Sequence, residues 1–181
     1  DMTTAKAEFK KYWQINTLQP PQQSDNGVIL NNRQGDLVGK THVNMLVPAA
    51  ADRHIEILSG KDAFNVFGNQ YEPPTVSHPE VNGHRIMVSP QQANQHNHYL
   101  TVLQMTSDDT KPLDIEYTET EVSFVVSIAD RVVSMSKNSA LIETPFTVRV
   151  PAGGERQVLL TGLAPGNWTV RSDDGEPHFA G

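Results

Sequence analysis

The sequence contains no cysteine among its 181 residues. Disulfides, thiolate metal sites and a cysteine nucleophile are therefore excluded. Long apolar runs are also lacking, because none approaches the ~20 residues that a membrane-spanning helix needs. The sequence starts at Asp1 without an initiator methionine or a recognisable signal peptide. We therefore expect a processed product or a piece of a longer protein.

Basic clusters are scarce. The sequence has 14 Lys and Arg residues against 21 Asp and Glu residues, which gives a formal net charge of -7. Its longest basic cluster is the pair Lys10-Lys11. Nucleic-acid binding normally needs a basic face, so this class of function is disfavoured. An acidic chain also repels polyanions at long range, so binding an acidic polymer would need a locally basic cleft.

Helical periodicity is absent along the chain. Instead, short runs alternate between apolar and polar residues and end at Gly, Pro or Asn turns, as antiparallel strands do. We therefore predict an all-β protein: an antiparallel β-sandwich of two stacked sheet layers with a second small antiparallel β domain. The polar segment from Ser107 to Pro112 is the predicted boundary, which places the domains at residues 1–107 and 108–181.

The strand predictions follow this alternation. One stretch, residues 84–106, contains two apolar runs around a polar loop that begins at Pro90, and we predict that it forms a β-hairpin. The segment 61–83 is rich in Gly and Pro, and its aromatic residues predict that it packs on the sheet. The remaining predicted strands are 8–18, 28–30, 36–48, 53–58, 122–128, 132–136, 146–150, 157–161 and 168–171.

The predicted hairpin loop carries His96 and His98 next to Tyr99. His with Tyr can supply a proton acceptor and a proton donor close together, as acid–base catalysis needs. On a strand the two imidazoles would share one face and could bind a metal if a carboxylate joined them. No Asp or Glu lies nearby in the sequence. Solvent-exposed loop histidines, a ligand contact and catalysis therefore all stay open.

His84 and Arg85 precede the first apolar run of this hairpin. A guanidinium group binds planar anions through two parallel hydrogen bonds, so Arg85 could hold a carboxylate or a sulfate. The alternative is an exposed strand on which Arg85 pairs with a neighbouring strand. We take His84, Arg85, His96, His98 and Tyr99 as candidate substrate-binding residues. We assign no catalytic residue and no metal ligand in this chain.

Three segments, taken together, resemble the C-terminal part of the heparinase II/III-type polysaccharide lyases. The segment AEFKKYWQINTLQPP is similar to the family's F-K-x-x-W strand with its proline-ended turn. GDLVGKTHVNMLVP followed by IEILSG is similar to a strand that ends in L-L-P and the segment after it. HRIMVSP with YLTVLQM resembles the family's V-S-P and F-L-x-V-L-Q strands. These segments follow one another across residues 8–105.

The resemblance implies a parent enzyme with an upstream α/α toroid, followed by stacked antiparallel β-sheets. It implies cleavage of uronate-containing acidic polysaccharides, such as alginate or a glycosaminoglycan, by β-elimination, in the periplasm or outside the cell. The family's Tyr and His catalytic motifs, and its divalent metal site, lie upstream of the matched part. A His that the family often has three residues after the Trp is replaced here by Asn16. We therefore expect a supporting part that holds no cofactor of its own and whose partners are the toroid and an acidic polysaccharide.

Two other functions remain open from the sequence. An all-β chain with scattered aromatic residues and Arg85 near polar loops is also typical of a non-catalytic carbohydrate-binding module. A structural or adhesive sandwich that binds another protein is the second alternative. Neither a membrane nor a nucleic acid is an expected partner.

Overall fold

The computed structural model describes residues 2–72, 83–138, 140–171 and 177–178. Within these residues it confirms the all-β class, with mostly antiparallel sheets and two short 3₁₀ helices. Within the described residues, no helix has the length and apolar character needed to cross a membrane. The chain divides into two compact units, Asp1–Leu113 and Asp114–Gly181. The sequence analysis placed the division after Ser107.

The first unit contains two main sheets. One has four strands in the order β11-β5-β4-β3, and the other has three in the order β2-β9-β6. The strands of the first sheet are β3 (Gln22–Ser24), β4 (Gly27–Gln34), β5 (Leu37–Val47) and β11 (Leu100–Ser107). Those of the second are β2 (Trp13–Thr17), β6 (Arg53–Ser59) and β9 (His84–Pro90). The smaller elements are β1 (Met2–Phe9), β10 (Asn94–His98), β7 (Asn65–Val66), β8 (Asn69–Gln70), η1 (Ala50–Asp52) and η2 (Gly60–Phe64).

The core of this unit lies between the two sheets. Successive side chains of a strand point to opposite faces of its sheet, and the mainly apolar faces of the two sheets pack against each other. The four-stranded sheet contributes Val28, Leu30, Val43 and Met45, and the three-stranded sheet contributes Ile86 and Val88. Trp13, Ile15, Ile55 and Ile57 pack against this cluster, together with the buried Tyr99. The predicted two-layer sandwich is therefore confirmed.

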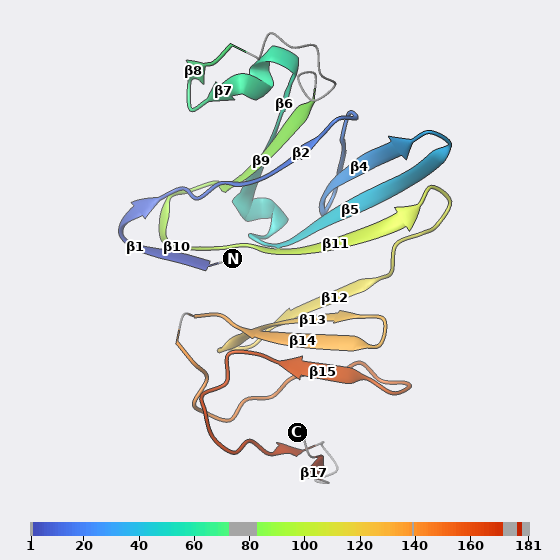
Figure 1. Cartoon of the computed structure of the whole chain (residues 1–181). Coiled ribbons are helices and arrows are strands. Elements are labelled where there is room, and N and C mark those ends of the chain that lie inside the picture. The colour runs from blue at the N-terminus through green and yellow to red at the C-terminus, as the bar shows by residue number, and fades with distance from the viewer. Residues whose placement is uncertain (1, 73–82, 139, 172–176, 179–181) are drawn as a thin grey trace. The chain divides into compact units, whose positions relative to one another are not determined.

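The predicted hairpin at residues 84–106 is wrong. Strand β9 pairs with β2 and β6, whereas β11 pairs with β5 in the other layer (Figure 1). The polar stretch between them is a strand as well, because β10 pairs with β1. Asn97 is buried there, and its amide donates to the carbonyl oxygens of Phe9 and Asn94. The chain thus crosses from one layer to the other instead of turning back on itself.

The N-terminal predictions also need correction. The single strand expected at 8–18 is two strands in different sheets, since β1 ends at Phe9 and β2 begins at Trp13. Residues 31–34, which fall between the strands expected at 28–30 and 36–48, belong to β4, which continues to Gln34. The reversal takes place at Gly35, whose φ of 61° lies in the left-handed region that favours glycine. Polar residues at an exposed hairpin tip therefore resembled a turn.

The segment expected to pack on the sheet does so less than predicted. Phe64 is half-buried, but Phe67 and Tyr71 are 72% and 57% exposed. The Phe67 ring contacts the edge of Tyr12, with the ring centroids 5.1 Å apart. The part of this segment from 73 to 82 lies outside the described residues.

The second unit contains a four-stranded sheet in the order β12-β13-β14-β15. Its strands are β12 (Ile115–Glu119), β13 (Ser123–Ile128), β14 (Arg131–Ser136) and β15 (Gln157–Leu160), and a separate pair joins β16 (Val170–Arg171) to β17 (Pro177–His178). Strand β13 is buried nearly throughout. Strand β15 runs parallel to β14, because the long connection after β14 returns the chain to the same end of the sheet. The strand expected at 146–150 is not one.

Candidate functional site

A groove opens in the first unit between the end of β2 and the tip of the β4–β5 hairpin. Its volume is about 540 Å³, within the range of about 300–1,000 Å³ that small-molecule sites occupy. Two separate segments line it, and each is rich in amide side chains. The groove residues are Asn16, Thr17, Leu18, Gln19, Leu30, Asn31, Asn32, Arg33, Gln34, Leu37, Val38 and Gly39.

Most amide groups in this groove have no partner within the described part of the chain. Asn16, Gln19, Asn31 and Gln34 make no side-chain hydrogen bond there. Asn32 donates to the Thr41 hydroxyl at 3.1 Å. Ile15 and Leu30 point into the core, so strand alternation turns the side chains of the next residues, Asn16 and Asn31, to the outer faces of their sheets.

Arg33 is the charged residue among the groove residues. Its Nε donates to the carbonyl oxygen of Gly35 at 3.1 Å, which orients the guanidinium group at the hairpin tip. The terminal nitrogens of Arg33 have no partner within the described residues, and no carboxylate lines the groove. Leu30 points into the core, so Arg33 lies on the outer face of its sheet, and its charge is not directed into the space between the sheets.

Two of the predicted site residues lie beside this groove. In the strand register Thr17 is opposite His84 and Asn16 is opposite Arg85, so both follow the β2 wall. His84 Nδ1 lies 2.7 Å from the Ser59 hydroxyl. The Arg85 Nη2 donates to the Asn65 carbonyl oxygen, and its buried Nε has no partner in the described structure. Arg85 therefore links β9 to β7 and is not among the groove residues.

The other three predicted residues lie on or next to β10, away from the groove. His96 is exposed, and its Nδ1 lies 3.0 Å from the Thr4 hydroxyl. His98 is half-buried and is paired with Met2 in the register of β1 and β10. Within the described residues, no group of three or more His, Cys, Asp or Glu side chains could hold a metal ion. The structure therefore separates the His96 cluster from His84 and Arg85.

Tyr99 connects the two layers. Its side chain is buried, with 5% exposure, and its hydroxyl is 2.5 Å from the Lys11 carbonyl oxygen and 3.1 Å from that of Val88. Burial, with a smaller contribution from Tyr12, raises the pKa of Tyr99 to about 12. A phenol that keeps its proton and donates it to backbone carbonyls is placed to stabilise the fold.

The sequence analysis did not single out Arg53, although it is the buried cation of this unit. Arg53 has 7% exposure, and burial lowers the pKa of its guanidinium group. Its Nη1 donates to the carbonyl oxygens of Met45 and Pro48 at 2.8 and 3.0 Å, and its Nη2 donates to that of Asp25 at 3.3 Å. Arg53 therefore holds the ends of three backbone segments together.

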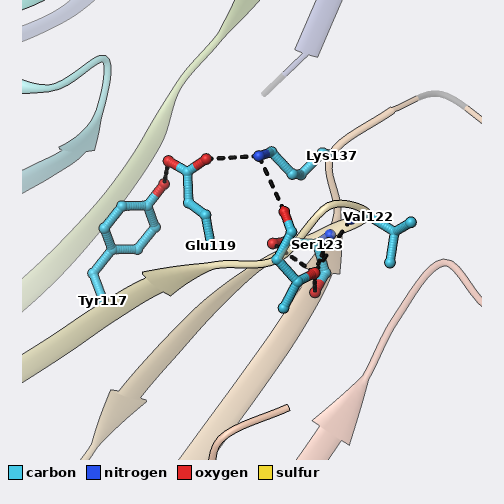
Figure 2. A network of polar contacts seen from close by, with 6 residues as sticks. Tyr117, Glu119, Val122, Ser123 and Lys137 are labelled. Carbon is cyan, nitrogen blue, oxygen red and sulfur yellow. Dashed lines mark hydrogen bonds and ion pairs between the residues drawn. The ribbon is translucent and has the colours of Figure 1, made fainter. Parts of the chain in front are cut away.

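A second polar network lies in the C-terminal unit (Figure 2). The Tyr117 hydroxyl donates to one carboxylate oxygen of Glu119 at 2.5 Å, and Lys137 donates to the other at 2.7 Å. Lys137 also donates to the Thr120 carbonyl oxygen at 3.2 Å and lies 5.3 Å from the centroid of the Phe124 ring. These contacts join β12 and β13 to the end of β14.

The Tyr117 phenol does not act as a base near neutral pH. Burial raises the pKa of Tyr117, and the hydrogen bond to the Glu119 carboxylate and its negative charge raise it further. The network was not predicted, because its members are far apart in sequence and each looks like an ordinary strand residue. One local signal existed: Tyr117 and Glu119 are two residues apart and share a strand face.

The groove was missed for a related reason. The sequence analysis left residues 31–34 outside the predicted strands, and it noted Asn16 only for a missing His. The sequence did contain a signal. The segments 16–19 and 31–34 each carry amide side chains, the second also carries an Arg, and both follow strand residues of the core. Which of these segments meet is decided by strand pairing that the sequence does not reveal.

Comparison with known proteins finds a similarity in the second unit. Residues 117–180 match the family model described as the heparinase II C-terminal domain. This match begins within β12 and extends beyond β17, whereas the segments on which the sequence resemblance was based lie in the first unit. No curated protein matches the chain.

Proposed function

Because this chain carries a heparinase II-like C-terminal domain, we propose that it is the C-terminal β part of a polysaccharide lyase. The proposed parent enzyme cleaves uronate-containing polysaccharides by β-elimination, in the periplasm or outside the cell. In this proposal the present chain supports the catalytic part and does not perform the reaction. The parent's α/α toroid, its first sandwich strands and its divalent metal would lie upstream.

The observation that supports this role is an uncovered part of the sandwich interior. Leu103 and Met105 share the inner face of the four-stranded sheet, because Leu103 is paired with the fully buried Val43 and Met105 with Thr41. Yet Leu103 is 55% and Met105 is 86% exposed. The three-stranded sheet covers one end of this face and leaves the other end open.

The edge of the same sheet is open as well. Strand β11 is the last strand of its sheet among the described residues, and it offers eight residues for further pairing. Leu103 and Met105 continue the buried core and lie on a strand with an open edge. Additional strands of the same sandwich would cover both the side chains and the edge. This continuity favours upstream strands of the parent enzyme as the occupant.

Two tyrosines in the described part of the chain have hydroxyl groups that are already hydrogen-bonded. Tyr99 and Tyr117 both have raised pKa values and both donate their protons to neighbouring groups. A phenol whose proton is held in this way is poorly suited to act as a base, which supports a parent enzyme whose acid and base lie upstream.

The test is the ultraviolet absorbance of the unsaturated uronate that elimination produces. We expect the present chain to give no such product from alginate or from a glycosaminoglycan, and the longer protein to give it. Turnover by the present chain alone would contradict the supporting role. A longer protein that folds and cleaves neither class of polymer would contradict the lyase assignment.

A further inference from the structure

We propose that residues 146–150, which we call the strap, close against the open edge of β15 as a fifth strand of the second unit's sheet. In the structure the strap has no regular structure, and β15 is the last strand of its sheet among the described residues. The proposal adds a conformational change to this unit. Neither the change nor its test depends on lyase activity.

The first argument is the uncovered edge of β15. The backbone N–H groups of Gln157 and Thr161 donate to carbonyl oxygens on the side of β14. Successive residues of a strand point their N–H groups to opposite sides, so those of Val158 and Leu160 point to the open edge. The side chains of Val158 and Leu159 are 46% and 56% exposed. Unpaired backbone groups beside exposed apolar side chains are the features that one more strand would cover.

The second argument is the sequence and the contacts of the strap. Phe146, Val148 and Val150 alternate with Thr147 and Arg149, and aromatic and β-branched residues of this kind are enriched in strands. Within the described part of the chain, no residue from 143 to 155 makes a hydrogen bond. The strap thus has the pattern of a strand and backbone groups that a strand partner would satisfy.

The third argument is the connection between the strap and β15. It consists of residues 151–156, and its two glycines, Gly153 and Gly154, have φ angles of 93° and 72°. These angles lie in the left-handed region, which suits the tight reversal of a hairpin. Parallel pairing would need a connection of about a dozen residues or more. The strap therefore reaches β15 in the antiparallel direction.

The register of this pairing follows from the connection and from the face of each side chain. A loop of four residues, 152–155, sets Arg149 opposite Val158 and Val148 opposite Leu159. The first is the hydrogen-bonded pair, because the Val158 amide faces the edge. The second brings two apolar side chains together and covers the exposed Leu159. A slip of one residue would place Arg149 beside Leu159 and turn the apolar face of the strap to the other side of the sheet.

The first measurement is hydrogen exchange of the β15 amides in the present chain, followed by NMR. We expect the amides of Val158 and Leu160 to exchange at least about tenfold more slowly in the unchanged chain than in Thr147→Pro/Arg149→Pro. Proline at these positions has no N–H group for β15 and disfavours a paired strand. The amide of Thr161, which is already bonded on the β14 side, should exchange equally in both proteins and shows that the sheet is intact.

The matched control is Thr144→Pro. It places a proline in the same segment without hydrogen bonds, but outside the strap. The exchange rates of the Val158 and Leu160 amides should stay within about twofold of those in the unchanged chain.

The second measurement uses the lack of cysteine in the chain, because an introduced pair is then the only one. Facing Cα atoms in a pair that is not hydrogen-bonded lie about 4.5 Å apart, a separation that a disulfide can bridge. Val148→Cys/Leu159→Cys should therefore form a disulfide within one chain at least about tenfold faster than the slipped pair Arg149→Cys/Leu159→Cys.

Four results would overturn the proposal. Equal exchange of the Val158 and Leu160 amides in the unchanged chain and in the double-proline variant would show that the strap does not cover the edge. An equal effect of Thr144→Pro would show that the strap is not the segment responsible. A slipped pair that forms its disulfide as fast would refute the register. Disulfides that form only between two chains would show that the edge pairs with a second copy.

Discussion

The hydroxyl of Tyr99 provides the most direct test of how the two layers are held together. Tyr99→Phe removes one oxygen and leaves the buried ring in place. The variant loses the hydrogen bonds to the carbonyl oxygens of Lys11 and Val88, which lie in the connection to β2 and in β9. Because the phenol has one proton for its two acceptors, the variant loses the equivalent of one hydrogen bond. The two buried carbonyl oxygens also lose a donor, which adds to the cost. We expect a loss of about 1–2 kcal/mol in the free energy of unfolding.

The measurement is urea unfolding followed by tryptophan fluorescence. Trp13 belongs to the first unit and Trp168 to the second, so a Trp168→Phe background leaves Trp13 as the reporter of the unit that contains Tyr99. We expect a lower midpoint with an unchanged m-value, and a melting temperature lower by about 3–8 °C. A change below about 0.3 kcal/mol would refute the assignment of Tyr99 to the fold.

The remaining predictions concern other close contacts. Gly27→Ala should lower the free energy of unfolding by more than about 3 kcal/mol, because a Cβ there would lie 2.0 Å from the Val43 carbonyl oxygen. Gly35→Ala has open space around it and should cost only about 1 kcal/mol. Equal unfolding midpoints for the two variants would contradict this. Arg53→Met should cost about 2–4 kcal/mol by chemical denaturation, since three backbone carbonyls lose a charged donor, and a neutral effect would show that they find other partners. Because the pKa of Tyr99 is raised to about 12 in the folded chain, its contribution to stability is complete below pH ~10 and is lost as the pH rises through ~12. Tyr99→Phe should therefore lessen the alkaline loss of stability, measured as unfolding free energy against pH, and an identical loss in both proteins would contradict the shift.

Local alternation was sufficient to predict the fold class and several strands. Strand β5 was predicted within a residue of its bounds, because Val43 and Met45 alternate with half-buried polar neighbours over a long run. Strands β6 and β14 follow the same rule. The core of each layer is therefore visible in the sequence wherever one face of a strand is buried.

Strand pairing could not be predicted in this way. The runs at 86–88 and 99–105 are both apolar and close in sequence, which favours a hairpin, yet their partners β2 and β5 lie much earlier in the chain. The polar strand β10 has no apolar face to reveal it, since its partner β1 is also largely exposed. The parallel arrangement of β15 likewise depends on the path of a connection without regular structure.

The candidate site could likewise be predicted only in part. His84 and Arg85 were selected for their chemistry, and their strand lies beside the groove because β9 pairs with β2. His96, His98 and Tyr99 were selected by proximity in sequence, and they lie elsewhere because the chain changes layers at Tyr99. The groove itself depends on two segments that only the register of β2, β4 and β5 brings together.

The central claim is that this chain completes a larger lyase through the open inner face of its sandwich. The most direct test is lyase turnover by the longer protein with Leu103→Lys and Met105→Lys, compared with Leu141→Lys, which changes an exposed leucine of the second unit. Both substituted side chains on β11 are exposed in the present chain, so its own unfolding free energy should change by less than about 0.5 kcal/mol. The account predicts that the longer protein loses at least tenfold in kcat/KM or fails to assemble, while the Leu141 variant keeps full activity. Full activity and unchanged stability of the longer protein with both lysines would contradict it.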